Sequence, residues 1–403
     1  MKFLHTGDWH LGKRLERFDR EEEQRAILKE ICQIADEEEV DLILIAGDLF
    51  DTFNPPNQAV EDFYQTVKVL SKNGERAVVA IAGNHDSPQR IEAPDPLARA
   101  SGIIFAGYPN SQPVPFELET GLALTRSAPG FAELRLPGVA FPVRLLLTPY
   151  ANEVRLRKAL GSEAEIGPAL QQHWAALADE YCDDQGVNLL VAHLYMMTRG
   201  GTPPEEPEDE RPIRIGNASA VPTDSIPDAI QYAALGHLHR HQNMSGGPCP
   251  VVYPSSILGY SFSEAGQKKY VVIGQLEPGQ PVQYDRRELK SGLPLVRKTF
   301  AEIDEAVVWL NENQECFVEL TIQTRSFIEG ADRRRLVLAH PRILGPKLQF
   351  TGEAREEDHG KGIDLNQGRQ ELFRSYFRDR EGVDPGDEIM ALLREIIGEE
   401  AEA

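Results

Sequence analysis

Five short apolar segments of this chain are each followed within three residues by side chains that can bind a divalent metal. Most of the segments are rich in Val, Ile and Leu, which predicts buried β-strands. They span residues 2–5, 42–46, 78–82, 189–191 and 233–235. The polar residues after them are Gly7-Asp8-Trp9-His10, Gly47-Asp48-Leu49-Phe50-Asp51, Gly83-Asn84-His85-Asp86, His193 and Gly236-His237-Leu238-His239. Because ligands collect at the carboxyl ends of strands in layered α/β folds, these loops are expected to meet at one site.

Imidazole and carboxylate groups together suit a transition metal such as manganese, iron or zinc. Each piece by itself has an ordinary structural interpretation. Gly-Asp after a strand is a common turn, and a lone histidine such as His193 is more often a core or surface residue than a ligand. His237 and His239 share one face of a strand simply because side chains alternate along it. The combination, in this order and always after a strand, favours a metal centre.

The motifs resemble those of the calcineurin-like metallophosphoesterase superfamily. Within it they are most similar to the double-strand-break repair nuclease branch, and there to the bacterial SbcD family. The segments that carry the resemblance are Leu4–Gly12, Ala46–Thr52, Ala82–Ser87, Ala234–Arg240 and Tyr253–Ile257. They lie in the first two-thirds of the chain, and beyond about Leu293 the resemblance is one of layout rather than of motifs.

The resemblance implies an α/β fold, a two-sheet sandwich flanked by helices, with a small α/β capping domain and C-terminal helices. It assigns residues 1–288 to a metallophosphoesterase nuclease domain, 289–350 to a DNA-binding capping domain, and 351–403 to a linker and docking helices. The pattern at the start of the chain agrees, since it predicts alternating strands and helices and hence a parallel sheet. The predicted helices span residues 21–39, 58–71 and 163–182, and strands dominate from Val143 onward.

Carried over motif by motif, the resemblance implies two metal ions held by seven side chains. They are Asp8, His10 and His239 for the first ion, Asn84, His193 and His237 for the second, and Asp48 as the bridge, with one ion on each oxygen. Two ions can clamp a scissile phosphate and stabilise its leaving oxygen. The expected metal is Mn²⁺, with Mg²⁺ or another divalent ion as the alternative.

His85, next to the ligand Asn84, is expected to be a general acid or an electrostatic support for the leaving 3′ oxygen. Asp86 has two interpretations: it orients the imidazole of His85 and raises its pKa, or it caps the turn that follows it. Where some relatives carry a histidine that touches the phosphate, this chain has Asp51. Candidate phosphate or groove contacts, each with a solvated loop as the alternative, are Lys13, Arg14, Arg17, Arg240 and His241.

The net charge of -22 opposes strong unaided DNA binding. Much of the acid lies in residues 205–210 and from Glu353 onward, which need not touch DNA. The Gly-, Pro- and acid-rich segment 199–211 is either a solvated insertion or a lid.

Four scattered cysteines without a Cys-x-x-Cys pair fit reduced thiols in the cytoplasm, and no apolar stretch reaches membrane-spanning length.

The last third of the chain contains candidate interaction segments. Arg333, Arg334 and Arg335 are either a solvated helix face or a DNA contact. Two amphipathic stripes follow a polar linker over residues 352–366, namely Leu372, Phe373, Tyr376 and Phe377, and then Ile389, Leu392, Leu393, Ile396 and Ile397. They pack on their own domain or, as the resemblance implies and we favour, dock an SbcC-like coiled-coil ATPase, with the chain as a homodimer within a heterotetramer.

The leading functional hypothesis is a metal-dependent nuclease that, with the SbcC ATPase, cleaves DNA hairpins and processes double-strand ends. The resemblance implies ATP-dependent 3′–5′ double-strand exonuclease and single-strand endonuclease action in DNA repair, recombination and replication. The alternative is a small-molecule or lipid phosphodiesterase of the same superfamily. A scaffold without catalysis is disfavoured because every ligand position is filled.

Overall fold

The structure, a computed structural model, describes residues 1–150, 166–201, 220–325, 327–350, 368–381, 384–386, 389–390 and 393. The chain forms two compact units. One consists of Met1–Ile322 and Ile328–Leu348, and the other of Gln323–Phe327 and Gln349–Ala403. The metal-binding motifs all lie in the first unit. Among the described helices, none is both long enough and apolar enough to cross a membrane.

A six-stranded sheet with the order β16-β15-β1-β2-β3-β4 carries the first three motifs. Its strands are β1 (Lys2–Thr6), β2 (Leu42–Ile45), β3 (Ala77–Ile81), β4 (Ile103–Ala106), β15 (Lys269–Gln275) and β16 (Gln283–Leu289). The strands β1 to β4 are parallel, and β15 and β16 add antiparallel on the β1 side. Every residue of β2 and β3 is buried, as expected for parallel strands covered on both faces.

An eight-stranded sheet with the order β13-β14-β12-β9-β8-β7-β6-β5 carries the remaining motifs. Its strands are β5 (Phe116–Glu117), β6 (Ala123–Ala128), β7 (Phe131–Arg135), β8 (Val143–Thr148), β9 (Val187–His193), β12 (Tyr232–Gly236), β13 (Gln242–Met244) and β14 (Val251–Tyr253). The strands β8, β9, β12 and β14 are parallel. An antiparallel meander, β5 to β8, extends one edge.

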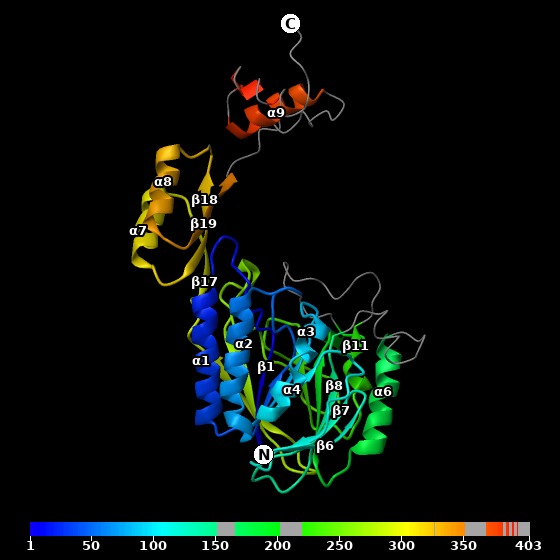
Figure 1. The fold of residues 1–403 in the computed structure, drawn as a ribbon. Helices are drawn as coiled ribbons and strands as arrows, with labels where there is room; N and C mark the ends of the chain where they lie inside the picture. Colours follow the sequence, from blue (N-terminus) through cyan, green and yellow to red (C-terminus); the bar gives the residue numbers. More distant parts are fainter. Residues whose placement is uncertain are drawn as a thin grey trace. The chain divides into compact units, whose positions relative to one another are not determined.

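The two sheets pack face to face over one hydrophobic layer, and helices cover their outer faces. The inner layer joins residues such as Leu44 and Val79 of the first sheet to residues such as Leu189 of the second. Figure 1 shows α1 (Glu21–Glu37) and α2 (Asn57–Leu70) on one flank and α6 (Ile166–Tyr181) on the other. Their apolar faces pack on the sheets, with Phe63 of α2 and Trp174 of α6 at 0% exposure. The predicted α/β sandwich flanked by helices is thereby confirmed.

Shorter elements complete the sandwich. They are α3 (Pro88–Glu92), α4 (Asp95–Ala98), the paired strands β10 (Met196–Met197) and β11 (Val221–Pro222), and the 3₁₀ helices η1 (Lys72–Gly74), η2 (Arg99–Ser101), η3 (Thr223–Ser225) and η4 (Phe262–Glu264). The helix η4 begins with a capping box in which Ser261 and Glu264 satisfy each other's backbone N–H groups.

A three-stranded sheet lies in the segment predicted to be a capping domain. Its strands are β17 (Leu295–Phe300), β18 (Phe317–Thr324) and β19 (Ile343–Phe350), and its helices are α7 (Ile303–Glu312) and α8 (Gly330–Ala339). These elements bury a core of their own around Leu310, Leu320 and Leu336. The arginine run 333–335 lies within α8 and is exposed.

The second unit contains α9 (Arg369–Glu381), on which Phe373 and Phe377 pack with ring centroids 5.8 Å apart. Several predicted features fall outside the described residues: the linker 352–366, residues 202–211 of the acidic segment, and Leu392, Ile396 and Ile397 of the second stripe.

Candidate metal centre

The predicted ligands meet where strands of both sheets end. Asp8 and His10 follow β1, Asp48 follows β2, and Asn84 follows β3, all in the six-stranded sheet. From the eight-stranded sheet, His193 ends β9, and His237 and His239 follow β12. All seven side chains are buried, with at most 9% exposure. The structure thus brings together every residue that the sequence predicted as a ligand.

The ligands form two adjacent groups. The donor atoms of Asp8, His10 and His239, which we call the first group, lie within 4.8 Å of one another. The donor atoms of Asp48, His193 and His237 do the same, and Asn84 joins them through a contact of 2.9 Å between its Oδ1 and His193 Nε2. We call Asn84, His193 and His237 the second group.

In the first group the donor atoms are spaced as ligands of a shared ion would be. His10 Nε2 and His239 Nε2 are 2.9 Å apart. Two nitrogens each about 2.1 Å from one ion lie roughly 3 Å apart at an angle near 90°. Asp8 Oδ1 accepts the backbone N–H of His237 at 2.8 Å, whereas Oδ2 is buried without a hydrogen-bond partner among the described residues. Burial raises the pKa of Asp8 to about 7, so its charge is costly unless a cation is near.

In the second group the hydrogen bonding of His193 fixes which nitrogen faces the site. Its Nδ1 lies 2.8 Å from the carbonyl oxygen of Ala46, which can only accept, so Nδ1 donates. The other nitrogen, Nε2, faces Asn84 Oδ1 and lies 3.4 Å from Asp48 Oδ2. Burial lowers the pKa of His193, but Asp48 outweighs this and raises it to about 9. The pocket therefore favours positive charge at this nitrogen.

Asp48 lies between the two groups. Its Oδ2 is 3.7 Å from His10 Nε2 and 3.4 Å from His193 Nε2, and it accepts no hydrogen bond from the described residues. Its Oδ1 accepts the backbone N–H of His85 at 2.9 Å. Burial opposes ionisation, yet His193 and His10 hold the pKa of Asp48 well below its usual range. One oxygen, Oδ2, faces both groups, which differs from the expectation of one ion on each oxygen.

Four of these residues have backbone conformations that residues other than glycine rarely adopt. The φ angles are +52° at Asp8, +44° at His10, +49° at Asp48 and +106° at His237. Such residues cost about 1–3 kcal/mol each and cluster at functional sites. Backbone hydrogen bonds hold two of them, since the N–H of Asp8 donates to the carbonyl of Gly47 and that of His10 donates to the carbonyl of Asp48.

Asp86 has neither of its predicted contacts, and this part of the sequence prediction is corrected. Its two carboxylate oxygens accept the backbone N–H groups of Gly83 at 2.8 Å and of Leu49 and Phe50 at 3.0 Å. It therefore ties the loop after β3 to the loop after β2 and does not orient the imidazole of His85. Asp86 thereby contacts the two residues that directly follow Asp48.

His85 lies beside the first group and is oriented by a different residue. Its ring centroid is 4.8 Å from that of His10, and its Nδ1 donates to the carbonyl oxygen of Asp51 at 2.6 Å. The carboxylate of Asp51 lies 3.9 Å from His10 Nδ1 and 3.5 Å from Lys13 Nζ. Asp51 thus connects His85, His10 and Lys13.

The other basic candidates differ in their contacts. Arg14 donates to the carbonyl of Arg17 at 2.8 Å, and Arg17 donates to the carbonyl of Ile343 in β19 at 3.0 Å. Arg240 is exposed, and His241 packs against Tyr270 with ring centroids 5.5 Å apart. Of the five candidates, Lys13 has a described contact to the residues around His85.

Sequence reasoning missed Gln24, which supports the loop that carries His10. Gln24 is 2% exposed, donates to the carbonyl of His10 at 3.0 Å, and accepts the N–H of Gly12 at 3.1 Å. The sequence does indicate a buried role for Gln24, because this polar residue lies on the helical face that Ile27 and Ile31 define.

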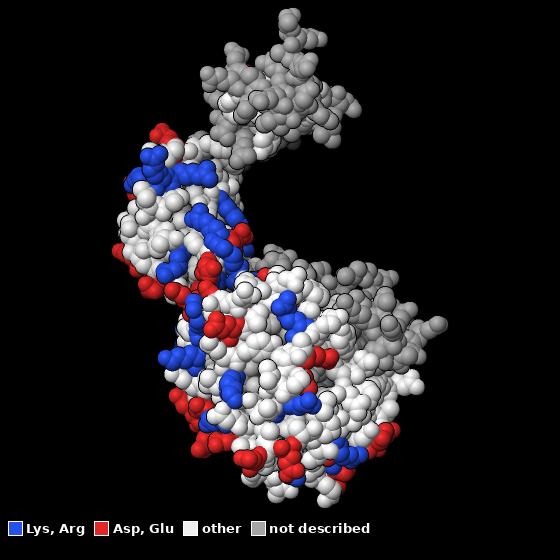
Figure 2. Space-filling view, viewed as in Figure 1, with Lys and Arg blue, Asp and Glu red and all other residues white. Residues whose placement is uncertain are grey.

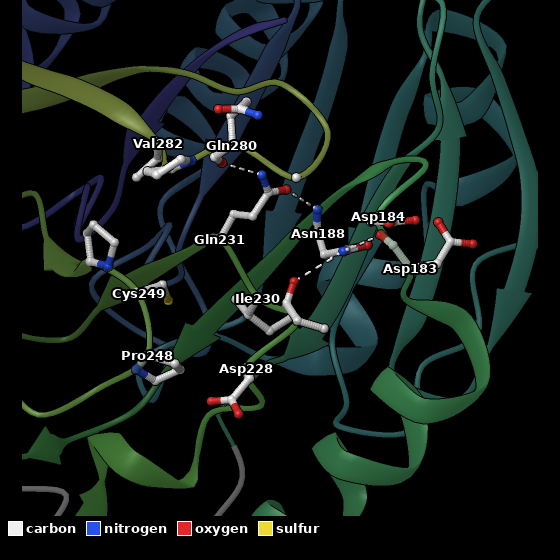
Figure 3. Close-up of a pocket in the computed structure, with 14 residues that line it drawn as sticks. Asp183, Asp184, Asn188, Asp228, Ile230, Gln231, Pro248, Cys249, Gln280 and Val282 are labelled. Carbon is white, nitrogen blue, oxygen red and sulfur yellow. Dashed lines mark hydrogen bonds between the residues drawn. The ribbon is translucent and has the colours of Figure 1, made fainter.

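A cavity of about 520 Å³ lies beside the starts of β9 and β12, at the ends opposite to His193 and His237 (Figure 3). Its lining includes Asn188, near the start of β9, and Gln231, which precedes β12. Gln231 donates to the carbonyl of Gln280 at 2.6 Å and accepts the N–H of Asn188 at 3.1 Å. None of the predicted ligands lines this cavity, so it is separate from the metal centre.

Comparisons with known proteins agree with this geometry. Residues 1–126 match the calcineurin-like phosphoesterase family. The chain is 33% identical to a Bacillus subtilis protein named as the D component of the nuclease SbcCD, over 98% of this chain and 97% of that protein. Proteins of the same name from Rhodobacter capsulatus and Escherichia coli K12 are 34% and 30% identical. The Rhodobacter match covers 69% of this chain and 67% of that protein, and the Escherichia match covers 83% and 81%.

Proposed function

The chain belongs to the SbcD family of nucleases, and from this premise we propose that its seven clustered ligands hold two divalent metal ions that support hydrolysis of DNA. As a member of this family it is an SbcD-like nuclease, a hydrolase that acts on phosphodiester bonds. The metals, the residue roles and the partners described below are proposals.

The observation that carries the proposal is the environment of Asp48 Oδ2. This buried oxygen has no hydrogen-bond partner among the described residues and faces imidazole nitrogens of both groups. A buried carboxylate oxygen is costly unless a donor or cation satisfies it. Asp8 Oδ2 is in the same condition. A cation beside Asp8 would satisfy its Oδ2, and Asp48 Oδ2 would be satisfied by that cation and by a second one. The residues therefore fit the dimetal centre of the superfamily.

In the proposed centre, Asp8, His10 and His239 hold one ion, the second group holds the other, and Asp48 bridges them. Such a pair, when bound, supplies Lewis-acid activation of the phosphate and of the attacking water. Nitrogen and oxygen donors without thiolate favour Mn²⁺, with Mg²⁺ as the alternative.

The surrounding residues would handle the proton and the phosphate charge. His85 donates through Nδ1 to Asp51, so Nε2 is the nitrogen that would deliver a proton to the leaving 3′ oxygen. The Lys13 ammonium, 12% exposed in its side chain and close to Asp51, would attract the phosphate anion. Asp86 would act by keeping Asp48 in place.

The three-stranded sheet with its two helices is proposed to be the DNA-binding capping domain. Residues 289–350 contain nine Lys and Arg against eight Asp and Glu, whereas the whole chain has a net charge of -22. Figure 2 shows Lys and Arg side chains gathered on one face of this region. Three of its basic residues are already paired, since Arg297 and Lys347 contact Glu319 and Arg335 contacts Asp304. The region as a whole is therefore close to neutral, and strong DNA affinity would depend on a partner.

That partner is proposed to be an SbcC-like coiled-coil ATPase that binds the C-terminal helices. On α9, Tyr376 is 49% exposed beside the packed rings of Phe373 and Phe377. With the ATPase, the chain would cleave hairpins and process double-strand ends as a homodimer within a heterotetramer. Four free cysteines continue to favour a reducing compartment, the cytoplasm.

The test compares the wild type with Asp48→Ala. We expect the wild type to bind two Mn²⁺ per chain and to cleave linear and single-stranded DNA much faster than a chromogenic phosphodiester. Asp48→Ala should lose both ions and all activity, because a methyl group cannot replace a shared carboxylate. A variant with wild-type metal content would refute the bridge, and preference for the small ester would favour the small-molecule alternative.

A further inference from the structure

A buried ion pair outside the metal-binding motifs lies against His239 at two points, its carbonyl oxygen and its imidazole. Glu264 in η4 is 3% exposed, and Lys269, the first residue of β15, is 7% exposed. Lys269 Nζ donates to the carbonyl oxygen of His239 at 2.9 Å and pairs with Glu264 Oε2. Glu264 Oε1 lies 3.5 Å from His239 Nδ1. The lysine thus holds the main chain of this ligand, and the glutamate faces its imidazole.

The same glutamate also reaches the loop that carries the other histidine of the first group. Glu264 Oε1 accepts the backbone N–H of Tyr260 at 2.9 Å. The Tyr260 hydroxyl donates to the carbonyl oxygen of Trp9, the residue before His10. The Tyr260 ring also lies against His10, with ring centroids 5.5 Å apart. Glu264 therefore connects both sides of the first group.

The second group has different supports. His193 donates to the carbonyl of Ala46, and Asn84 Oδ1 lies against His193. Within the described part of the chain, the hydrogen bonds of Glu264 and Lys269 extend to neither His193 nor Asn84. The ion pair thus contacts His239 and, through Tyr260, the loop of His10, whereas its hydrogen bonds reach neither His193 nor Asn84.

We propose that Glu264 and Lys269 are positioning residues for one of the two metal ions. They set the affinity for that ion independently of the affinity for the other ion. The inference rests on the proposed assignment of two ions. A carboxylate at the far nitrogen of a ligand imidazole fixes the tautomer and the ring orientation. A proton on Nδ1 toward Glu264 leaves Nε2, the nitrogen that faces His10, to bind metal.

A buried ion pair has a desolvation cost that apolar residues of similar size would avoid. Here the cost is accompanied by contacts that aim a ligand, with Ser256 Oγ accepting a further hydrogen bond from Lys269 at 2.8 Å. The pair is therefore better explained by the metal centre than by core packing.

The experiment measures Mn²⁺ binding to the full chain by calorimetry, and the pairing of the two ions by electron paramagnetic resonance. The test variant is Glu264→Gln, which retains an acceptor for the Tyr260 N–H. A second variant, Glu264→Gln with Lys269→Met, leaves no buried charge unpaired and gives the same prediction if the single variant does not fold.

The matched control removes a lysine–glutamate pair from the surface nearby. Lys268 and Glu288 form an exposed ion pair at 2.9 Å, with 63% and 36% side-chain exposure. Lys268→Met with Glu288→Gln should leave both affinities unchanged, because this pair does not contact His239.

The expected result is that one Mn²⁺ binds about 10- to 100-fold more weakly in Glu264→Gln, the usual effect of removing such a support, while the other affinity stays within about twofold. At limiting Mn²⁺ the spectrum should then change from a coupled pair to a single ion. Equal weakening of both ions, or no weakening in a folded variant, would overturn the inference alone. A wild-type chain that takes up fewer than two ions would overturn the metal assignment and this inference with it.

Discussion

Replacing Gly83 with alanine should disable the metal centre, although the change adds only one methyl group. A Cβ atom at Gly83 would lie 2.1 Å from Asp48 Oδ1 and 2.2 Å from the Asp48 backbone nitrogen. Real Cβ atoms do not approach other heavy atoms more closely than about 3.0 Å, so Asp48 or the loop after β3 must move by roughly 1 Å. The obstacle is partly backbone, so rotation of a side chain cannot relieve it.

The size of the effect follows from this displacement. A misplacement of about 1 Å at a catalytic constellation can cost about 100-fold in rate, and overpacking in a well-packed interior costs about 1–3 kcal/mol of stability. We therefore expect Gly83→Ala to stay folded, to bind Mn²⁺ weakly and to lose about 100-fold or more in DNA cleavage. Metal content, thermal unfolding and cleavage rate should be measured on one preparation.

Gly7 provides a matched control, because it also stands next to a ligand in a motif. A Cβ at Gly7 would meet nothing closer than Ala46 at 3.5 Å, an ordinary contact. Gly7→Ala should therefore retain activity within a few-fold of the wild type. Wild-type metal binding in Gly83→Ala, or an equally large loss in Gly7→Ala, would refute the argument that backbone proximity to Asp48 demands glycine.

Two further predictions concern the proton donor and the tail. His85→Ala should keep both ions while single-turnover cleavage slows by ~10²–10⁴-fold, the usual weight of general acid catalysis, and loss of an ion would make His85 a ligand instead. A chain that ends at about Thr351 should keep Mn²⁺-dependent cleavage of short single-stranded DNA, since every proposed ligand precedes it, but should fail to pull down the ATPase. Full partner binding by that chain would refute the docking role and indicate that α9 packs on the protein's own core instead.

The sequence predicted the sheet core well, because the parallel strands are short, apolar and closely followed by motifs. The helices α1 and α2 begin and end within two residues of the predicted bounds. The strands β4 to β7 were not predicted. β5 has two residues, and β6 contains Thr125 and Arg126 at exposed positions, so neither carries a strong apolar alternation. Their place in the fold comes from antiparallel pairing with neighbours, which a local pattern does not encode.

For the site, too, features set by the local sequence were predictable and features set by tertiary contacts were not. The proposed ligands were predictable because chemistry restricts metal binding to a few residue types, and each stands at a strand end. The roles of Asp86 and Glu264 were not predictable, since both depend on contacts with residues distant in sequence. Asp86 was placed correctly near the site but given the wrong partner, because adjacency to His85 in sequence does not put the two side chains in contact.

The proposed metal centre also requires that the two sheets be joined rigidly. Each proposed ion takes ligands from loops of both sheets, so sliding of one sheet over the other would separate Asp8 from His239 and Asp48 from His193. Without metal, the site opposes folding, because four of its residues have left-handed φ angles and two carboxylate oxygens are buried without partners among the described residues. The apolar layer between the sheets, with residues such as Leu44 and Leu189 at 0% exposure, supplies the compensating stability. The sandwich is therefore the part of the molecule that would hold this costly arrangement of proposed ligands in place for two cations.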